Sequence, residues 1–179
     1  MSDQEYFKNR GMNQWHYMQS NIWMDYFNPK KVLDVGCGLG NLVKAFNYFG
    51  VDSYGCDISV FAVDNAHMEI REKVKVGDVR KIPYLDNFAD LVVCYDVLEH
   101  LNEDEVDSAL NELKRVSSKW VLCSICFLND PNFPLDPTHK LCKSRNWWEH
   151  QFELRNMKVH KVPNNFLFNQ QLVIAEVIK

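Results

Sequence analysis

Short apolar stretches alternate with amphipathic ones along most of this chain. Five apolar stretches have the length of buried strands, at residues 31–35, 52–56, 73–76, 89–95 and 120–125. Between them, apolar residues recur at helical spacing, as Val106, Leu110 and Leu113 do in a helix predicted over 103–116. Strands that alternate with helices are typical of a parallel, doubly wound α/β sheet.

The two ends of the chain extend this pattern. Helical spacing predicts four further helices, at residues 15–26, 42–49, 59–67 and 145–154. Two closing strands, near 157–162 and 168–178, flank a Pro-Asn-Asn turn and are predicted to form an antiparallel pair. We therefore expect a single domain, residues 1–179, built on a seven-stranded sheet. The sheet is expected to be mostly parallel, with an antiparallel last strand and helices on both faces.

Composition narrows the classes of function. The formal net charge is -4 and no basic stripe is present, which argues against a nucleic acid or an anionic membrane as the main partner. The polar N-terminus does not resemble a secretory signal, and no apolar run approaches the ~20 residues of a membrane span. Most of the six cysteines, such as Cys94, sit in apolar strand patterns, as free buried cysteines do. We expect a cytoplasmic protein.

The segment Asp34-Val35-Gly36-Cys37-Gly38-Leu39-Gly40 follows the first predicted strand. Its alternate glycines let the backbone turn sharply and approach a ligand closely. Asn41 stands where a dinucleotide fingerprint needs its third glycine, and no Gly-Lys-Ser/Thr of a P-loop follows. Because phosphate is costly beside Asp34, the loop favours a cationic ligand without phosphate. S-adenosylmethionine (SAM) has this chemistry.

With this loop, the chain from about Lys31 to at least Ile125 resembles the class I SAM-dependent methyltransferases. The stretch Leu98-Glu99-His100-Leu101 is similar to one found in the small-molecule branch that includes ubiquinone- and menaquinone-biosynthesis enzymes. The resemblance implies a Rossmann-like fold, SAM as cofactor and a small-molecule methyl acceptor.

Two more acids follow the loop at predicted strand ends. Asp57 lies 21 residues after Gly36 and can accept hydrogen bonds from both ribose hydroxyls. The resemblance implies that Asp78 accepts a hydrogen bond from the adenine amino group. Each acid could instead be a turn carboxylate that binds local N–H groups. The expected cofactor-binding residues are Asp34, Gly36, Cys37, Gly38, Gly40, Asp57, Ile58, Asp78, Val79, Tyr95 and Val97.

Two segments are candidates for acceptor binding. The loop 126–143 is too long for a simple connection and follows the fifth strand, on the ligand side of the sheet. Its Asp136-Pro137-Thr138-His139 resembles a segment near the acceptor pocket of related enzymes, so His139 is the candidate general base or acceptor-orienting residue; a surface loop histidine is the alternative. The resemblance also implies that the aromatic-rich segment 1–28 forms a lid over the cofactor.

A metal site is a further hypothesis for the same region. Asp96-x-x-Glu99-His100, with the distant His139, is similar to the ligand pattern of some metal-dependent methyltransferases. We favour the simpler interpretation, in which Glu99 and His100 order their loop and cap the next helix, and we expect no metal.

The expected function is in-line transfer of the SAM methyl group to a small molecule, which requires positioning more than a reactive side chain. A catalytically silent SAM-binding protein is one alternative. An NAD-linked oxidoreductase is another, although it would need a second, substrate-binding domain. The acceptor, the methylated atom and the oligomeric state stay open.

Overall fold

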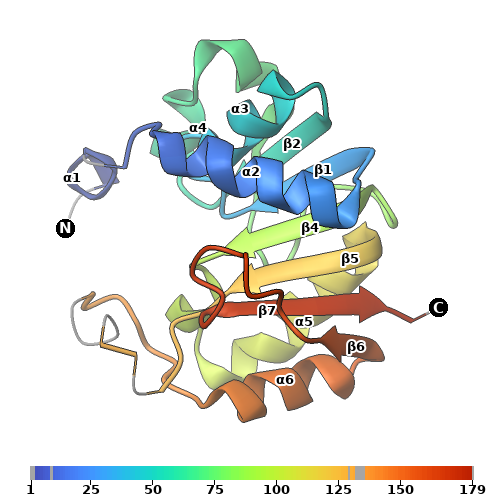
Figure 1. The fold of residues 1–179 in the computed structure, drawn as a ribbon. Coiled ribbons are helices and arrows are strands. Elements are labelled where there is room, and N and C mark those ends of the chain that lie inside the picture. The colour runs from blue at the N-terminus through green and yellow to red at the C-terminus, as the bar shows by residue number, and fades with distance from the viewer. Residues whose placement is uncertain (1–2, 9, 129, 132–135, 179) are drawn as a thin grey trace.

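A computed structural model describes residues 3–8, 10–128, 130–131 and 136–178 of the chain. Its centre is one seven-stranded sheet with the order β3-β2-β1-β4-β5-β7-β6 (Figure 1). The strands are β1 (Lys31–Val35), β2 (Asp52–Asp57), β3 (Val74–Val76), β4 (Ala89–Tyr95), β5 (Ser117–Ser124), β6 (Met157–His160) and β7 (Leu172–Val177).

Strand directions confirm the predicted doubly wound sheet. The strands β1 to β5 pair in parallel, and β7 runs antiparallel to both of its neighbours, β5 and β6. The chain leaves β1 toward β2 on one side and returns to β4 on the other, so the strand order reverses between β1 and β4. Open α/β sheets bind ligands outside the carboxyl ends of the strands at such a reversal.

The α-helices are α1 (Asp3–Phe7), α2 (Gln14–Phe27), α3 (Asn41–Tyr48), α4 (Val60–Asp64), α5 (Val106–Val116) and α6 (Arg145–Glu153). Among the described residues, the 3₁₀ turns are η1 (Met68–Lys73), η2 (Leu98–His100) and η3 (Glu103–Glu105). Local capping explains the bounds of α2. The Asn13 side chain accepts a hydrogen bond from the Trp15 backbone N–H at 2.9 Å, and Asn28 ends the helix in the left-handed conformation, with φ of 45°.

Helices cover both faces of the sheet, as expected. On one face, Trp23 of α2 and Phe46 of α3 join Leu91 of β4 in one apolar cluster. On the other face, Leu110 of α5 and Trp148 of α6 join a larger cluster with the central strands. This second layer lies at the bottom of Figure 1. Neighbouring residues of β4 enter different clusters, as alternation along a strand requires.

The helix expected over 59–67 is shorter in the structure. It ends at Asp64, and the chain continues into the 3₁₀ turn η1. The helix expected from Glu103 begins as the 3₁₀ turn η3, where the Glu105 side chain accepts a hydrogen bond from the Asn102 N–H. Strand β5 starts at Ser117, directly after α5, three residues earlier than expected.

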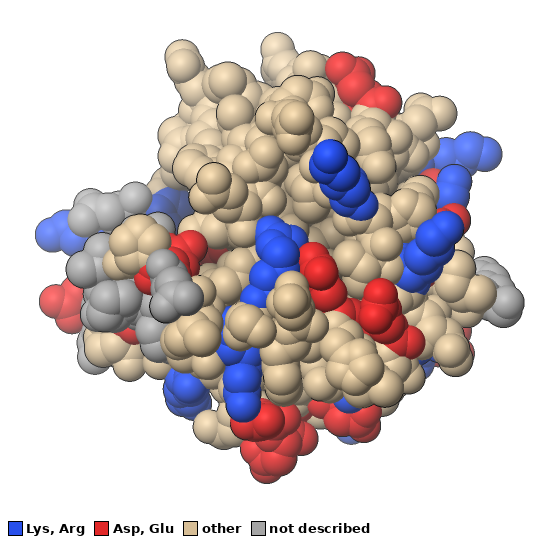
Figure 2. Space-filling view, turned by 60° about the horizontal axis from the view of Figure 1, so that its bottom comes forward, with Lys and Arg blue, Asp and Glu red and all other residues tan. Residues whose placement is uncertain are grey.

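The six cysteines are free, and all except Cys142 are buried. On the face shown in Figure 2, a narrow run of basic side chains has acidic side chains beside it and below it. Within the described residues, no helix has the length and apolar character needed to cross a membrane.

Candidate functional site

A cavity of about 690 Å³ opens at the carboxyl ends of β1, β2 and β4. Its volume lies in the usual range for sites that bind small molecules. Nine of the eleven expected cofactor-binding residues line it: Gly36, Cys37, Gly38, Asp57, Ile58, Asp78, Val79, Tyr95 and Val97.

The glycine loop forms the floor of the cavity. The N–H groups of Gly36 and Cys37 both donate to the Cys56 carbonyl oxygen of β2, at 2.7 and 3.0 Å, which ties the loop to the neighbouring strand. Gly36 has a φ of +81°, and a Cβ built on it would lie 2.2 Å from Cγ2 of Val97. The loop therefore requires glycine here both for its conformation and for its close approach to the segment after β4.

Asp57 stands beside this loop at the end of β2. Its two carboxylate oxygens accept hydrogen bonds from the backbone N–H groups of Gly38 at 2.7 Å and Ser59 at 2.8 Å. Burial raises the pKa of Asp57, and these two hydrogen bonds oppose the shift. Each oxygen keeps a second lone pair, so the carboxylate can also accept from ligand hydroxyls.

Asp78 is bound by Arg80, a residue that no sequence motif indicates. The Arg80 backbone N–H and Nε both donate to Asp78 Oδ1 at 2.8 Å, and its guanidinium also pairs with Glu105. The hydrogen bonds from Arg80 lower the pKa of Asp78. Arg80 and Glu105 line the cavity as well, so this cluster links β3 to the start of α5 across the opening. An Asp two residues before an Arg is too common a pattern to reveal such a clamp.

The segment after β4 forms the wall opposite β2. Tyr95 packs edge-on against Trp15 of α2, with ring centroids 5.2 Å apart, and burial raises its pKa. Asp96 adopts a left-handed conformation, with φ of 54°, and its Oδ1 accepts a hydrogen bond from the Ser124 hydroxyl at 2.5 Å. Val97 then reaches back over Gly36.

Three expected site residues do not line the cavity. Asp34 belongs to β1, paired with Gly55 and Val93, and is only 3% exposed. Gly40 caps α3, where a Cβ would lie 2.5 Å from Ile70, so packing rather than a ligand explains this glycine. His139 lies behind His100, with ring centroids 4.9 Å apart, and its neighbours Thr138 and Lys140 line the cavity instead.

The N-terminal segment covers the glycine loop. The ring of Phe7 in α1 lies 3.1 Å from where a Cβ on Gly38 would be, and Asp3 accepts a hydrogen bond from the Ser59 hydroxyl. The Asn41 side chain donates to the Arg10 carbonyl oxygen at 2.8 Å. Tyr6, Phe7 and Arg10 therefore form part of the cavity wall.

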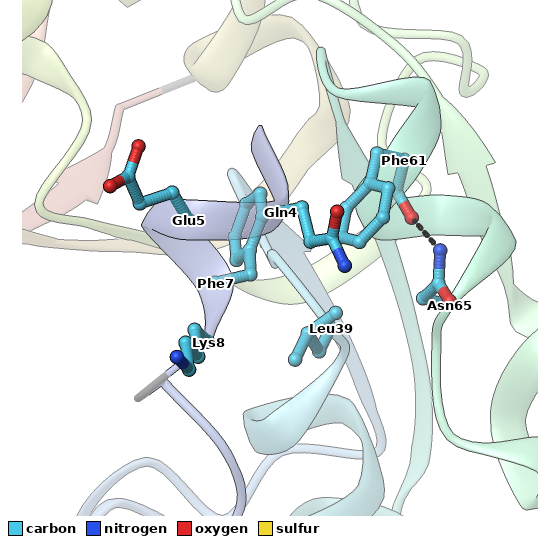
Figure 3. A pocket seen from close by; sticks show the side chains of 7 residues that line it. All are labelled: Gln4, Glu5, Phe7, Lys8, Leu39, Phe61 and Asn65. Carbon is cyan, nitrogen blue, oxygen red and sulfur yellow. Dashed lines mark hydrogen bonds between the residues drawn. The ribbon is translucent and has the colours of Figure 1, made fainter. Parts of the chain in front are cut away.

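A second hollow of about 510 Å³ lies between α1 and α4 (Figure 3). Phe7 and Leu39 line both hollows, so α1 is the partition between them. The remaining lining residues are Gln4, Glu5, Lys8, Phe61 and Asn65.

The region considered for a metal is organised by hydrogen bonds. Glu99 is 1% exposed, and its Oε1 accepts from the Cys126 N–H at 3.1 Å. His100 Nδ1 lies 3.0 Å from the Thr138 hydroxyl, which fixes the 126–143 loop to η2. In the parts of the chain that the structure describes, no group of three His, Cys, Asp or Glu side chains is arranged to hold a metal ion. Residues 129 and 132–135 of this loop lie outside the described residues.

Comparison with known proteins assigns the family. A model described as "Methyltransferase domain" matches residues 33–123, about half of the chain. The chain belongs to this family. As the resemblance implied, it is a class I SAM-dependent methyltransferase domain with a Rossmann-like fold.

Relatives and solved structures agree with this family. The chain is 36% identical over 88 residues to the ubiquinone biosynthesis O-methyltransferase of Thiobacillus denitrificans. The matched region covers 44% of this chain and 38% of that protein. It is 33% identical over 98 residues to norajmaline N-methyltransferase of Rauvolfia serpentina, and this match covers 50% of the chain and 33% of that protein. The chain thus spans well under half of these curated relatives. A SAM-dependent methyltransferase structure from Archaeoglobus fulgidus shares the fold, with a TM-score of 0.71 and 21% identity. The match covers 95% of this chain and 96% of that one.

Proposed function

We propose that this methyltransferase domain transfers the methyl group of SAM to a small-molecule acceptor. The observation that carries the proposal is the cavity at the ends of β1, β2 and β4, into which the glycine loop, Asp57 and Asp78 all project from successive strands. Family membership adds SAM as the cofactor that such a cavity serves.

The lining residues fit SAM by their chemistry. The glycine loop leaves a cradle that a Cβ would fill, at Gly36 and Gly38. Asp57 keeps acceptor lone pairs for the ribose hydroxyls, and Asp78 keeps one at Oδ2 for the adenine amino group, beside the apolar Val79. Tyr95 and Val97 would contact the methionine end. Asp34 and Gly40 would not contact SAM but would support the glycine loop from the side away from the cavity.

When bound, SAM supplies a methyl group that its sulfonium already activates for attack. The chain then has to hold the acceptor in line, exclude water and manage any proton that the acceptor loses. We propose that α1 and the segment to residue 28 act as the lid, since Phe7 and Arg10 already lie over the loop. The described part of the 126–143 loop would contribute Thr138 and Lys140 to the acceptor side.

A small molecule is the acceptor that the cavity supports best. Arg80 and Glu105 form an ion pair in the cavity lining. Arg10 of the lining pairs with Asp136, and their charged atoms lie 3.8 Å apart. A net charge of -4 also disfavours nucleic acid. The named relatives methylate small molecules at oxygen in one case and at nitrogen in another, so both atoms are candidates here.

Calorimetry tests the cofactor. We expect SAM and S-adenosylhomocysteine (SAH) to bind and NAD⁺ to show no binding at the same concentrations. Methyl-labelled SAM incubated with a library of phenols and amines should then yield a labelled product. Binding of NAD⁺ in preference to SAM would overturn the proposal, and SAM binding with no labelled product in any acceptor class would favour the silent binding protein.

A further inference from the structure

Asp96 differs from the other acids that stand at strand ends around the cavity. Asp57 accepts two backbone hydrogen bonds, and Asp78 is held by the guanidinium and the backbone of Arg80. Among the described residues, Asp96 accepts a hydrogen bond from the Ser124 hydroxyl alone. Its Oδ2 is left for something in the cavity that Asp96 lines.

The backbone holds this carboxylate in a defined place. Asp96 has a φ of 54°, a left-handed conformation that few residues other than glycine, asparagine and aspartate adopt and that also occurs at functional sites. Its backbone N–H donates to the Ser124 carbonyl oxygen at 3.2 Å while the Ser124 hydroxyl donates to Oδ1. The next strand therefore fixes both the main chain and the side chain of Asp96.

Asp96 lies between the glycine loop and the part of the cavity proposed to hold the acceptor. Val97, the next residue, contacts Gly36 of the cofactor loop. On its other side lie Arg10 of the N-terminal segment, His100 of η2 and Thr138 of the long loop. Burial raises the pKa of Asp96, while Ser124, Arg10, His100 and His139 oppose the shift. The Asp96 side chain is open to the cavity, and its raised pKa makes it a stronger base than a carboxylate with an ordinary pKa.

We propose that Asp96 is the acceptor-side catalytic residue, which binds an acceptor whose nucleophilic oxygen or nitrogen carries a proton. This inference rests on the proposed function. The acceptor lone pair forms a bond to the methyl carbon as the carbon–sulfur bond breaks, and sulfur keeps the electron pair of that bond. The proton of the acceptor O–H or N–H moves to Oδ2 of Asp96, so charge and atoms balance.

The test compares two cofactor analogues and needs no known acceptor. In sinefungin an amine-bearing carbon replaces the methylsulfonium, so a cationic N–H donor stands where the methyl group would be; SAH has no such donor. Wild-type protein should bind sinefungin more tightly than SAH. In Asp96→Asn this preference should fall about tenfold or more, the effect of losing one charge-assisted hydrogen bond. Affinity for SAH should change less than about twofold.

Two further variants make the result specific. Asp104→Asn removes the same charge from an exposed position outside the cavity and should keep the preference. Asp96→Gly also removes the carboxylate and suits the left-handed backbone, so it replaces Asp96→Asn if that variant does not fold. SAH binding with an unchanged ratio in both Asp96 variants overturns the role of Asp96 alone. Failure of the wild type to bind SAH overturns the proposed function as well.

The labelled-product assay distinguishes the two kinds of acceptor. Product from phenols or from amines identifies oxygen or nitrogen as the methylated atom. With either, Asp96→Asn should lower kcat and leave the KM for SAM within about twofold. An Asp96→Asn variant with wild-type kcat would overturn the proton transfer.

Discussion

Replacement of Gly36 by alanine tests how the glycine loop and the segment after β4 fit together. Gly36 and Gly50 have nearly the same left-handed φ, +81° and +82°. A Cβ on Gly36 would lie 2.2 Å from Cγ2 of Val97, whereas a Cβ on Gly50 would meet nothing within 4 Å. Gly50→Ala is therefore a matched control that carries the backbone penalty without the steric overlap.

The two penalties can be estimated separately. A left-handed conformation costs alanine about 1–2 kcal/mol relative to glycine, and both variants should lose this much stability. Overpacking against Val97 should add about 1–3 kcal/mol in Gly36→Ala alone. Val97→Ala removes Cγ2 and leaves Cβ at 3.5 Å, an ordinary contact, so the double variant should recover most of the added loss.

Urea denaturation of the two single variants, the double variant and Gly50→Ala gives the free energies of unfolding. The cycle formed by Gly36 and Val97 should show a coupling of about 1 kcal/mol or more. Calorimetry with SAM should show weaker binding to Gly36→Ala and unchanged binding to Gly50→Ala. Equal destabilisation by Gly36→Ala and Gly50→Ala, with no recovery in the double variant, would refute the steric argument.

Three other changes test separate parts of the structure. Burial and the nearby Asp96 raise the pKa of Glu99 to about 8, from an ordinary value of 4.5, so the folded protein binds this proton more tightly than the unfolded chain. Stability should therefore fall as pH rises between these values, and in Glu99→Gln the loss in urea denaturation should be smaller by about 4–5 kcal/mol; parallel pH curves would contradict the shift. Deletion of residues 1–10 should weaken SAM binding about tenfold in calorimetry, because Tyr6 and Phe7 leave the cavity wall, and unchanged affinity would rule out the lid. His139→Gln should leave the ratio of sinefungin to SAH affinity unchanged, and a lost preference would return the acceptor-side role to His139.

Much of the fold follows from local patterns. The buried strand β4 is a nearly continuous apolar run, and both β1 and β4 begin and end where the sequence predicts. Helix α2 carries its own capping residues at Asn13 and Asn28. The boundary between α5 and β5 could not be placed in this way, because Ser117 has no turn signal and its strand conformation is set by pairing with Ala89.

The sequence predicts those residues of the cavity whose place follows from their spacing after a strand. Asp57 and Asp78 follow strands whose carboxyl ends meet at one edge, so spacing alone brings them to the cavity. Spacing does not decide between His139 and Asp96 as the acceptor-side residue. Our proposal of Asp96 rests on its positive φ and on its hydrogen bond to Ser124, which lies 28 residues away in sequence. Neither feature leaves a pattern in the sequence.

Asp34 lies within the sheet and not in the cavity lining. Burial, with a contribution from Asp57, raises the pKa of Asp34 to about 8, so at neutral pH this carboxyl largely keeps its proton. A neutral Asp34 behind the loop cannot be what repels phosphate. The acids that can repel phosphate are those that line the cavity, which are Asp57, Asp78 and Asp96. The charge of Asp78 is balanced by Arg80. We therefore propose that the preference for a cation without phosphate comes from Asp57 beside the loop and from Asp96 opposite it.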